Sequence, residues 1–225
     1  MKAKPLIVAT LTDNEVKTDM LDVVAHADVI ELRVDMFDRK ELSDIKETFT
    51  QAIEIFKKPI IGTIRDRSEG GLFEYKDRSS LYLEISRFCK YIDIELSHGS
   101  LIRELKHLIR DSDISFIGSY HNFVNTPDYS ELKAILDNGV SLHVDITKIA
   151  VTPHTEDDVK RLLRFTDINR DRQIIAISMG DLGRDSRISG GLYGSRMTYG
   201  YVVKKTAEGQ IYIPELRREI DLLYD

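Results

Sequence analysis

The chain has 225 residues, of which 42% are hydrophobic and 31% charged, and its formal net charge is −6. This composition excludes an intrinsically disordered chain, and the acidic balance argues against nucleic-acid binding, which needs a basic face. A chain of this length can bury one large core, and it suits a single α/β barrel as well as two small domains.

A single cysteine, Cys89, excludes an internal disulfide and a cysteine-based zinc site. A lone thiol fits a reducing, cytoplasmic setting. The longest apolar run near the N-terminus, Leu6 to Ala9, is too short for a signal peptide or a membrane span. We therefore expect no membrane association and, because the first predicted strand starts almost at the first residue, no sizeable N-terminal extension.

Short runs rich in Ile and Val alternate with longer amphipathic stretches. Such runs are typical of buried parallel strands. The predicted strands are residues 6–11, 29–35, 59–65, 91–96, 116–121, 146–151, 173–179 and 196–202.

Two capping boxes mark helix starts between these runs. Thr12 with Glu15, and Thr155 with Asp158, each have the spacing in which two side chains satisfy the first backbone N–H groups of a helix.

Three further signals come from proline and glycine. Thr126-Pro127 indicates a helix cap followed by proline in the first turn, and Pro214 opens the last helix. Asn138-Gly139 indicates a helix stop.

Eight strands, each followed by a helical stretch, predict a (β/α)₈ barrel. No linker interrupts the chain, so we expect one domain over residues 1–225. The alternative is a doubly wound open sheet, which usually has fewer strands and often a glycine-rich first turn; the turn at residues 10–13 has no glycine.

Charged side chains alternate with apolar ones in two predicted strands. Because side chains alternate between faces, the apolar faces of a barrel should pack on the outer helices and the charges should point inward. The inward set has four acids and at least three cations: Glu31, Asp35, Asp93, Glu95, Arg33, Arg65 and Lys148. Unpaired buried charges are costly, so this balance indicates a structural ion-pair network, two exposed edge strands, or a polar pocket at the barrel mouth.

Lys148 and His121 are the candidate reactive groups. A buried amine next to other cations favours its neutral form, which is a nucleophile toward carbonyl groups; alternatively, Lys148 extends to solvent from the strand end. His121 ends a predicted strand, where it suits general acid–base work or a structural role. His143 and Asp145 share a face and are a weak alternative for metal binding.

Two segments are predicted to form loops over the barrel mouth. Residues 65–71 mix charges with two glycines, and residues 178–187 contain Gly180 and Gly183. Such loops approach a ligand closely or move as lids, or they are solvated turns.

The motifs that carry a family resemblance are Glu31-Leu32-Arg33-Val34-Asp35, Thr63-Ile64-Arg65, Glu69-Gly70-Gly71, Asp93-Ile94-Glu95, Ser119-Tyr120-His121-Asn122-Phe123, Lys148-Ile149-Ala150-Val151, and Ser178-Met179 with Gly183, Ser186 and Arg187. In this order and spacing, from residue 31 to residue 210, the chain resembles type I 3-dehydroquinate dehydratase. The resemblance implies a (β/α)₈ barrel that converts 3-dehydroquinate to 3-dehydroshikimate without a metal or an organic cofactor. It also implies a homodimer, as in many relatives.

By this resemblance, Lys148 forms a Schiff base with the substrate, and His121 is the general acid–base. Glu69 matches the carboxylate that orients His121. The substrate-binding set implied by the family comprises Glu31, Arg33 and Arg65 for the ring hydroxyls, Arg187 for the carboxylate, Met179 as an apolar wall, and Thr206 and Gln210 in the last loop.

The sequence departs from the family pattern in three places. The last loop has residues Thr206-Ala207-Glu208-Gly209-Gln210 where the family usually has Ser-Ala-Pro-Gly-Gln. Glu208 is expected to loosen this loop and to add negative charge near an anionic substrate. A first-strand serine of some members corresponds to Ala9 or Thr10, and the N-terminal hairpin that some members have under the barrel is absent from the sequence pattern.

Two other functions stay open at this stage. A class I aldolase also uses a strand lysine, but it would need a sugar-phosphate site, for which the last two loops offer only weak support. A non-catalytic binding barrel would keep the pocket without turnover, and the presence of Lys148, His121 and Glu69 argues against it.

Overall fold

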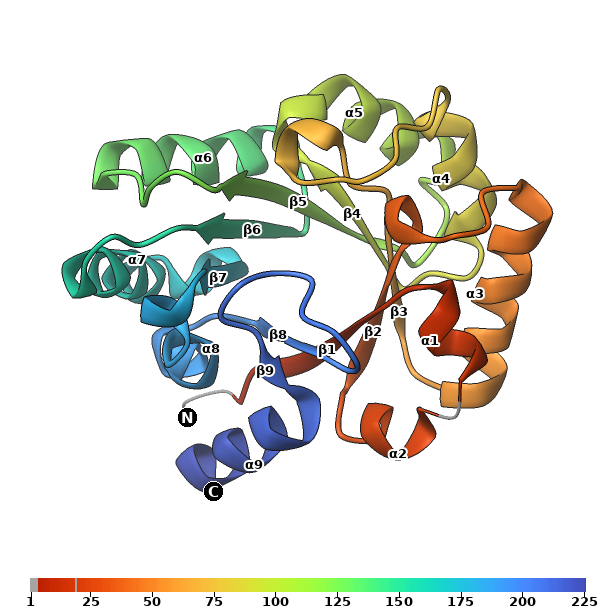
Figure 1. Ribbon diagram of the computed structural model, residues 1–225. Coiled ribbons are helices and arrows are strands. Elements are labelled where there is room, and N and C mark those ends of the chain that lie inside the picture. The colour runs from red at the N-terminus through yellow and green to blue at the C-terminus, as the bar shows by residue number, and fades with distance from the viewer. Residues whose placement is uncertain (1–3, 19) are drawn as a thin grey trace.

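The computed structural model describes residues 4–18 and 20–225, and it shows a curled sheet of nine parallel strands with helices around its outside (Figure 1). The strands are β1 (Leu6–Leu11), β2 (Val29–Arg33), β3 (Ile60–Thr63), β4 (Tyr91–Glu95), β5 (Ser115–Asn122), β6 (Ile146–Val151), β7 (Ile174–Ser178), β8 (Met197–Tyr201) and β9 (Ile211–Tyr212). The α-helices are α1 (Asp13–Lys17), α2 (Leu21–Val24), α3 (Leu42–Phe56), α4 (Arg78–Ser86), α5 (Gly99–Leu108), α6 (Tyr129–Ser141), α7 (Glu156–Ile168), α8 (Ser186–Ser189) and α9 (Ile213–Tyr224). The predicted barrel class is confirmed, and β9 is a short addition beside β8.

The barrel closes between β7 and β8. The ladder runs in the order β7-β6-β5-β4-β3-β2-β1-β8-β9. The backbone N–H of Arg196 donates to the carbonyl of Ile174 at 2.8 Å, and the N–H of Ala176 donates to Ser195 Oγ at 3.0 Å. Since all strands are parallel, their carboxyl ends meet at one rim, where barrels of this kind place their loops.

The second strand is shorter than predicted. It ends at Arg33, and the chain turns into a 3₁₀ helix over Val34–Met36. Asp35 therefore does not continue the strand alternation. It lies in the turn, fully buried.

Both predicted capping boxes are confirmed. Thr12 with Glu15 caps α1, and Thr155 with Asp158 caps α7. The prediction that Pro214 opens the last helix is also correct, because it lies in the first turn of α9.

The predicted ends of α6 are wrong. Asp128 caps this helix through a capping box with Glu131, whereas Thr126 donates its hydroxyl to the carbonyl of Thr152 at 3.1 Å. The helix also runs past Gly139 to Ser141. The glycine serves packing rather than termination, because a Cβ atom there would lie 2.3 Å from Thr147 Oγ1 on β6.

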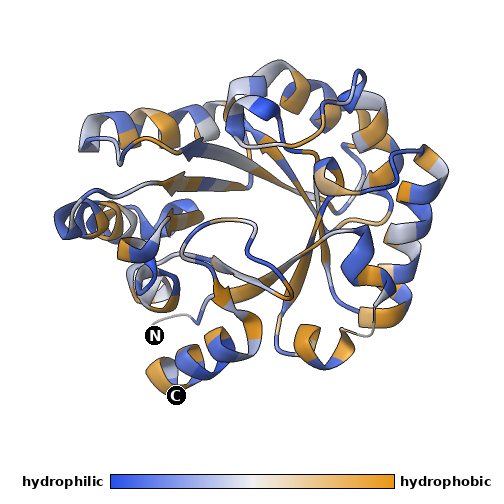
Figure 2. Ribbon diagram, in the orientation of Figure 1, coloured by the Kyte–Doolittle hydropathy of each residue, from blue (hydrophilic) through white to orange (hydrophobic). Residues whose placement is uncertain are grey.

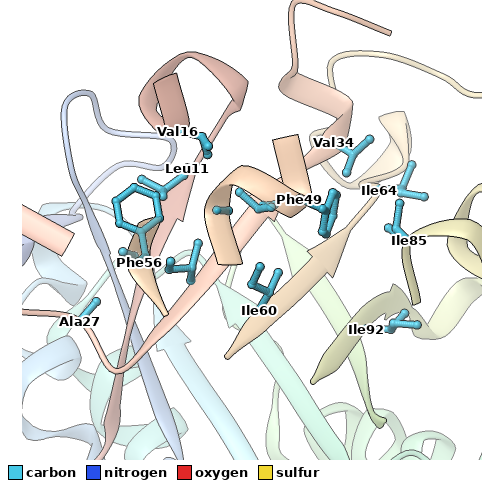
Figure 3. Packing of buried hydrophobic residues seen from close by; sticks show 14 of the residues in the cluster. Leu11, Val16, Ala27, Val34, Phe49, Phe56, Ile60, Ile64, Ile85 and Ile92 are labelled. Atoms are coloured by element: carbon cyan, nitrogen blue, oxygen red, sulfur yellow. The ribbon is translucent and has the colours of Figure 1, made fainter. Parts of the chain in front are cut away.

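Apolar residues between the strands and the surrounding helices form the main core. The outward residues of β2 and β4, such as Ile30 and Ile92, belong to it. On the helix side, Phe49 and Phe56 of α3 pack against this cluster (Figure 3). The helices carry hydrophobic and hydrophilic residues in alternation along their turns, as expected for one buried face (Figure 2).

The inside of the barrel has two layers of different chemistry. The layer nearer the amino ends of the strands is apolar and contains Val8, Val29, Ile61 and Ile117. Two residues further along the same strands, the next inward positions are polar: Thr10, Glu31, Thr63 and Ser119. The strand alternation thus places a polar layer directly below the carboxyl-end rim.

Replacement of Gly139 with alanine tests why α6 continues through a predicted stop. Alanine favours a helix over glycine by about 1 kcal/mol, but crowding a packed site costs about 1–3 kcal/mol. We expect Gly139→Ala to lower the free energy of unfolding, measured by urea denaturation. In a Thr147→Ala background the same change should become neutral or stabilising, and a stabilised single variant would contradict the packing role.

Candidate active site

A cavity of about 620 Å³, counting the open space at its mouth, lies at the carboxyl ends of the strands. It is lined by all ten residues selected from the sequence: Glu31, Arg33, Arg65, Glu69, His121, Lys148, Met179, Arg187, Thr206 and Gln210. The structure therefore brings the whole predicted set together, from six strands or their following loops.

Lys148 lies on β6 with its amine inside the barrel, and it does not extend to solvent. The residue is 4% exposed. Its Nζ atom lies 2.9 Å from Asp93 Oδ2 and 3.8 Å from Glu31 Oε1. The ring centroid of Tyr199 lies 4.3 Å from the same nitrogen. These contacts fix the amine at the floor of the cavity.

Asp93 is held as a carboxylate in the middle of the barrel. Arg65 Nη2 donates to its Oδ1 at 2.7 Å, and the Ser119 hydroxyl donates to the same oxygen at 2.6 Å. Although burial alone would raise its pKa, the charges of Arg65 and Lys148 hold the pKa of Asp93 well below its usual range. A permanent negative charge therefore faces the lysine.

Glu31 is fixed by two hydroxyl groups from neighbouring strands. Thr10 donates to Oε2 and Thr63 to Oε1, each at 3.0 Å. Thr10 also lines the cavity, whereas Ala9 faces the outer core. Of the two first-strand residues left open by the sequence, Thr10 is the one at the site.

His121 and Glu69 form a close pair at the cavity wall. The Nδ1 atom of the ring lies 2.9 Å from Glu69 Oε2, which also accepts the backbone N–H of His121 at 3.0 Å. Burial and the nearby charges of Arg65 and Lys148 lower the pKa of His121 well below its usual value, so the ring is neutral. We assign the ring proton to Nδ1, donated to Glu69, which leaves Nε2 as the basic nitrogen.

Glu69 itself has an unusual acidity. Burial, opposed by the charge of Arg65 and assisted by that of Glu95, raises the pKa of Glu69 to about 7. The Ser97 hydroxyl donates to its other oxygen at 3.3 Å. The Glu69 carboxyl group therefore gains and loses its proton near neutral pH, and perturbed pKa values of this kind are typical of functional sites.

Arg187 is a buried cation without a carboxylate partner among residues 4–18 and 20–225. Its Nη1 donates to the carbonyl of Tyr199 at 3.3 Å and its Nη2 to the carbonyl of Glu208 at 3.2 Å. Its Nε atom is buried and has no partner in the described part of the chain. Burial lowers the pKa of Arg187 to about 10. An unpaired guanidinium at a cavity wall is a ready site for an anion.

The loop after β8 lines the cavity, and hydrogen bonds to the Gln210 side chain hold its conformation. Gln210 Oε1 accepts the backbone N–H groups of Thr206 at 2.7 Å and Ala207 at 3.2 Å. The loop is docked on the preceding mouth loop, because the Gly180 N–H donates to the Glu208 carbonyl at 3.2 Å. The Glu208 side chain is exposed and does not line the cavity, so the charge expected near a ligand points elsewhere.

The sequence interpretation missed Tyr199 as a site residue. It lies on β8 two residues after the inward Met197, so strand alternation carried the signal. Its hydroxyl is buried and has no partner among the described residues. Burial and the charges of Glu31 and Asp93 raise its pKa well above the usual range, so it stays a neutral phenol.

The described ranges contain no cluster of three or more His, Cys, Asp or Glu side chains arranged to hold a metal ion. Within the same ranges, no helix has the length and apolar character needed to cross a bilayer.

The raised pKa of Glu69 predicts a pH-dependent stability. Between about pH 4.5 and pH 7 the folded protein keeps this proton while the unfolded chain has lost it, so the stabilisation present at low pH is lost as the pH rises to about 7. Glu69→Gln removes the titration. Its free energy of unfolding relative to wild type should therefore rise between pH 5 and pH 8 by on the order of 2 kcal/mol, since one pKa unit is worth about 1.4 kcal/mol.

The matched control for this comparison is Glu104→Gln. Glu104 also accepts a serine hydroxyl, from Ser79 at 2.7 Å, but it is exposed on α5. Its stability difference from wild type should stay constant over this range. If the stability difference between Glu69→Gln and wild type, measured by urea denaturation, also stayed constant from pH 5 to pH 8, the raised pKa of Glu69 would be contradicted.

Comparison with known proteins gives the family of the chain. The family model described as type I 3-dehydroquinase matches residues 5–225. The 3-dehydroquinate dehydratase of Thermodesulfovibrio yellowstonii is 38% identical over 213 residues, covering 94% of this chain and 92% of that protein. The one from Methanocella arvoryzae is 35% identical over 226 residues, with 99% of both chains covered.

Solved structures give the same result. The crystal structure of 3-dehydroquinate dehydratase from Geobacillus kaustophilus has a TM-score of 0.89 at 27% identity and covers 98% of this chain and 91% of its own. The type I enzyme from Clostridium difficile, solved with covalently modified comenic acid, has a TM-score of 0.89 at 31% identity, with 98% and 93% covered. The chain therefore belongs to the type I 3-dehydroquinase family and is a hydro-lyase of that type.

Proposed function

We propose that this chain dehydrates 3-dehydroquinate to 3-dehydroshikimate through an imine on Lys148. The observation that carries the proposal is the placement of a buried lysine amine within one cavity that also holds a neutral histidine and an unpaired arginine. The substrate is a polyhydroxy acid with a ketone, and each of these groups has a complementary partner in the cavity.

The first step joins the amine to the ketone. The Lys148 ammonium group first gives a proton to Nε2 of His121, and the neutral amine adds to the carbonyl carbon. The protonated His121 then returns this proton to the carbinolamine oxygen, which leaves as water and gives an iminium ion. An iminium withdraws electrons more strongly than a ketone, which lowers the barrier to proton loss from the adjacent carbon. The reaction therefore needs no metal or organic cofactor. The carboxylate of Asp93 lies where it stabilises the positive nitrogen.

His121 carries the protons in the next steps. Its basic Nε2 removes the proton from the carbon beside the iminium, and the resulting enamine expels the hydroxyl group one carbon further on. The proton on His121 leaves with that hydroxyl as water. Hydrolysis of the imine then releases the product and restores the amine. General acid–base assistance of the kind that His121 gives is typically worth about 10²–10⁴-fold in rate. Glu69 orients the ring and stabilises its protonated form.

The remaining cavity residues bind the substrate in this proposal. Arg187 binds the carboxylate with its planar fork. Glu31, Arg33 and Arg65 hold the ring hydroxyls, and Met179 forms an apolar wall. Thr206 and Gln210 close the cavity from the last loop.

Assembly and location also belong to the proposal. We propose that the chain acts as one domain, in the cytoplasm, as a homodimer. The half-buried Cys89 supports a reducing compartment, because a chain with a single cysteine forms no internal disulfide. Sedimentation of the purified protein measures the oligomeric state.

Borohydride trapping tests the imine directly. Wild type incubated with 3-dehydroquinate and borohydride should gain a covalent adduct on Lys148, mapped by mass spectrometry. Lys148→Ala should give no adduct at this position and no turnover, because no other group of the cavity is an amine. Lys58→Ala is the matched control: this partly buried lysine donates to the Ala27 carbonyl at 2.6 Å, away from the cavity, and its loss should leave the adduct intact.

A folded wild type that gave no adduct would overturn the imine mechanism. Binding of 3-dehydroquinate without turnover would favour a non-catalytic barrel, and turnover of phosphorylated sugars instead would favour an aldolase.

Replacement of Arg187 tests the carboxylate clamp. Hydrogen bonds to charged groups are worth about 1.5–3 kcal/mol, so Arg187→Ala should raise KM by about 10–150-fold with a smaller change in kcat. Arg184→Ala is the matched control three residues earlier, where the side chain pairs with Glu215 at 2.6 Å. A loss of kcat with an unchanged KM in steady-state assays would argue against the clamp.

A further inference from the structure

The loop over residues 65–72 carries three cavity residues, Arg65, Glu69 and Gly70, and its two ends are close together. The Gly71 N–H donates to the Asp66 carbonyl at 2.8 Å. A Cβ atom on Gly71 would lie 2.1 Å from the Arg65 carbonyl oxygen, so only glycine allows this close return of the chain. The position of Glu69 therefore depends on how the two ends of this loop are held.

Asp35 holds both ends of the loop. Its Oδ1 accepts the backbone N–H of Arg65, and its Oδ2 accepts the backbone N–H of Leu72, each at 3.2 Å. The guanidinium of Arg33 donates to the same two oxygens, from Nε at 2.9 Å and from Nη2 at 2.8 Å. One carboxylate thus joins the start of the loop, its end, and a cavity arginine.

These contacts require a charged acceptor. Asp35 is fully buried, and all four of its contacts are donors. Burial alone would raise its pKa, but the hydrogen bonds from Arg33 and from the two backbone groups keep it lowered, so the side chain is a carboxylate. An asparagine of the same shape would turn one oxygen into a donor facing other donors.

We propose that Asp35 is a positioning residue, which clamps the 65–72 loop so that Glu69 stays against His121. This inference rests on the proposed function of the pair, but Asp35 itself does not line the cavity. It acts on the reaction only through the loop and through Arg33.

Asp13 provides a matched control for a purely structural role. It is also fully buried and accepts two backbone N–H groups, from Asp38 at 2.9 Å and Arg39 at 3.2 Å. Its charged partners are Lys17, with Nζ at 3.7 Å, and Arg39, with Nε at 3.9 Å. The site of Asp13 is outside the cavity, so Asp13→Asn should lower stability without changing kinetics.

The test is a double-mutant cycle between Asp35→Asn and Glu69→Gln, with kcat measured on 3-dehydroquinate. A displacement of about 1 Å in a catalytic group costs about 10²-fold, so we expect Asp35→Asn to lower kcat by about 10–100-fold. In the Glu69→Gln background, the same change should lower kcat by less than about threefold, because the group that it positions has already lost its function. Equal losses in both backgrounds, or kinetics like those of Asp13→Asn, would overturn the proposal.

Gly71→Ala disturbs the same loop at its closure, against the Arg65 carbonyl, and replaces no charged side chain, so it covers the case in which Asp35→Asn fails to fold. It should give the same pattern in the cycle.

A second readout needs no substrate. In protein labelled with ¹⁵N-histidine, the His121 Nδ1 proton, assigned by its change in Glu69→Gln, should exchange faster with water in Asp35→Asn and Gly71→Ala than in Asp13→Asn. A wild type with no turnover but with this exchange pattern would contradict the proposed reaction and support the positioning role. An unchanged exchange rate would overturn the positioning role whatever the activity.

Discussion

The buried guanidinium of Arg65 is the interaction on which the site depends. Its two terminal nitrogens donate to Asp93 at 2.7 Å and to Glu95 at 2.9 Å. Asp93 then pairs with Lys148, and Glu95 with Arg78. A charge taken out of water needs partners of opposite sign and saturated hydrogen bonds. The reactive lysine is therefore one end of a chain of ion pairs, and removal of any member leaves a buried charge uncompensated.

The two layers inside the barrel have different roles: the apolar layer contributes to stability, and the polar layer carries the groups of the candidate site. The apolar lower layer is packed by side chains such as Val8 and Ile61, and it resembles an ordinary protein interior. The polar upper layer consists of groups that would be costly to bury alone, and neighbouring strands place them side by side: Thr63 is in register with Asp93, and Ser119 with Lys148. Because the polar layer is satisfied internally, the cavity above it contains fixed charges before any ligand arrives, which is the condition for electrostatic catalysis.

Much of this arrangement could be predicted from the sequence. Strand alternation was enough to turn Glu31 and Asp93 inward, and the ten selected residues all lie at one cavity. Two of the three alternatives for the charges, an ion-pair network and a polar pocket, describe the structure together, since the ion pairs of the upper layer form the floor of the pocket. The third, two exposed edge strands, is wrong, because β2 and β4 each pair with a strand on both sides.

The failures have local physical causes. Asn138-Gly139 predicts a helix stop because glycine often follows a helix end. Here glycine is needed for close packing against Thr147 on the next strand, a tertiary contact that the local sequence does not show. Asp35 was placed on a strand because the turn after Arg33 depends on tertiary hydrogen bonds to the 65–72 loop. Tyr199 was missed because an aromatic residue on a strand usually belongs to the core.

The last loop is docked almost entirely through its main chain. Gly180 and Arg187 both donate to the carbonyl oxygen of residue 208, and Gly209, at φ 73°, lies against the Gly180 backbone. Contacts of this kind do not depend on the side chain at residue 208, so the loop keeps its place with glutamate there. Position 208 is thus a natural attachment point for a fluorescent dye that would report opening and closing of the loop without touching the cavity.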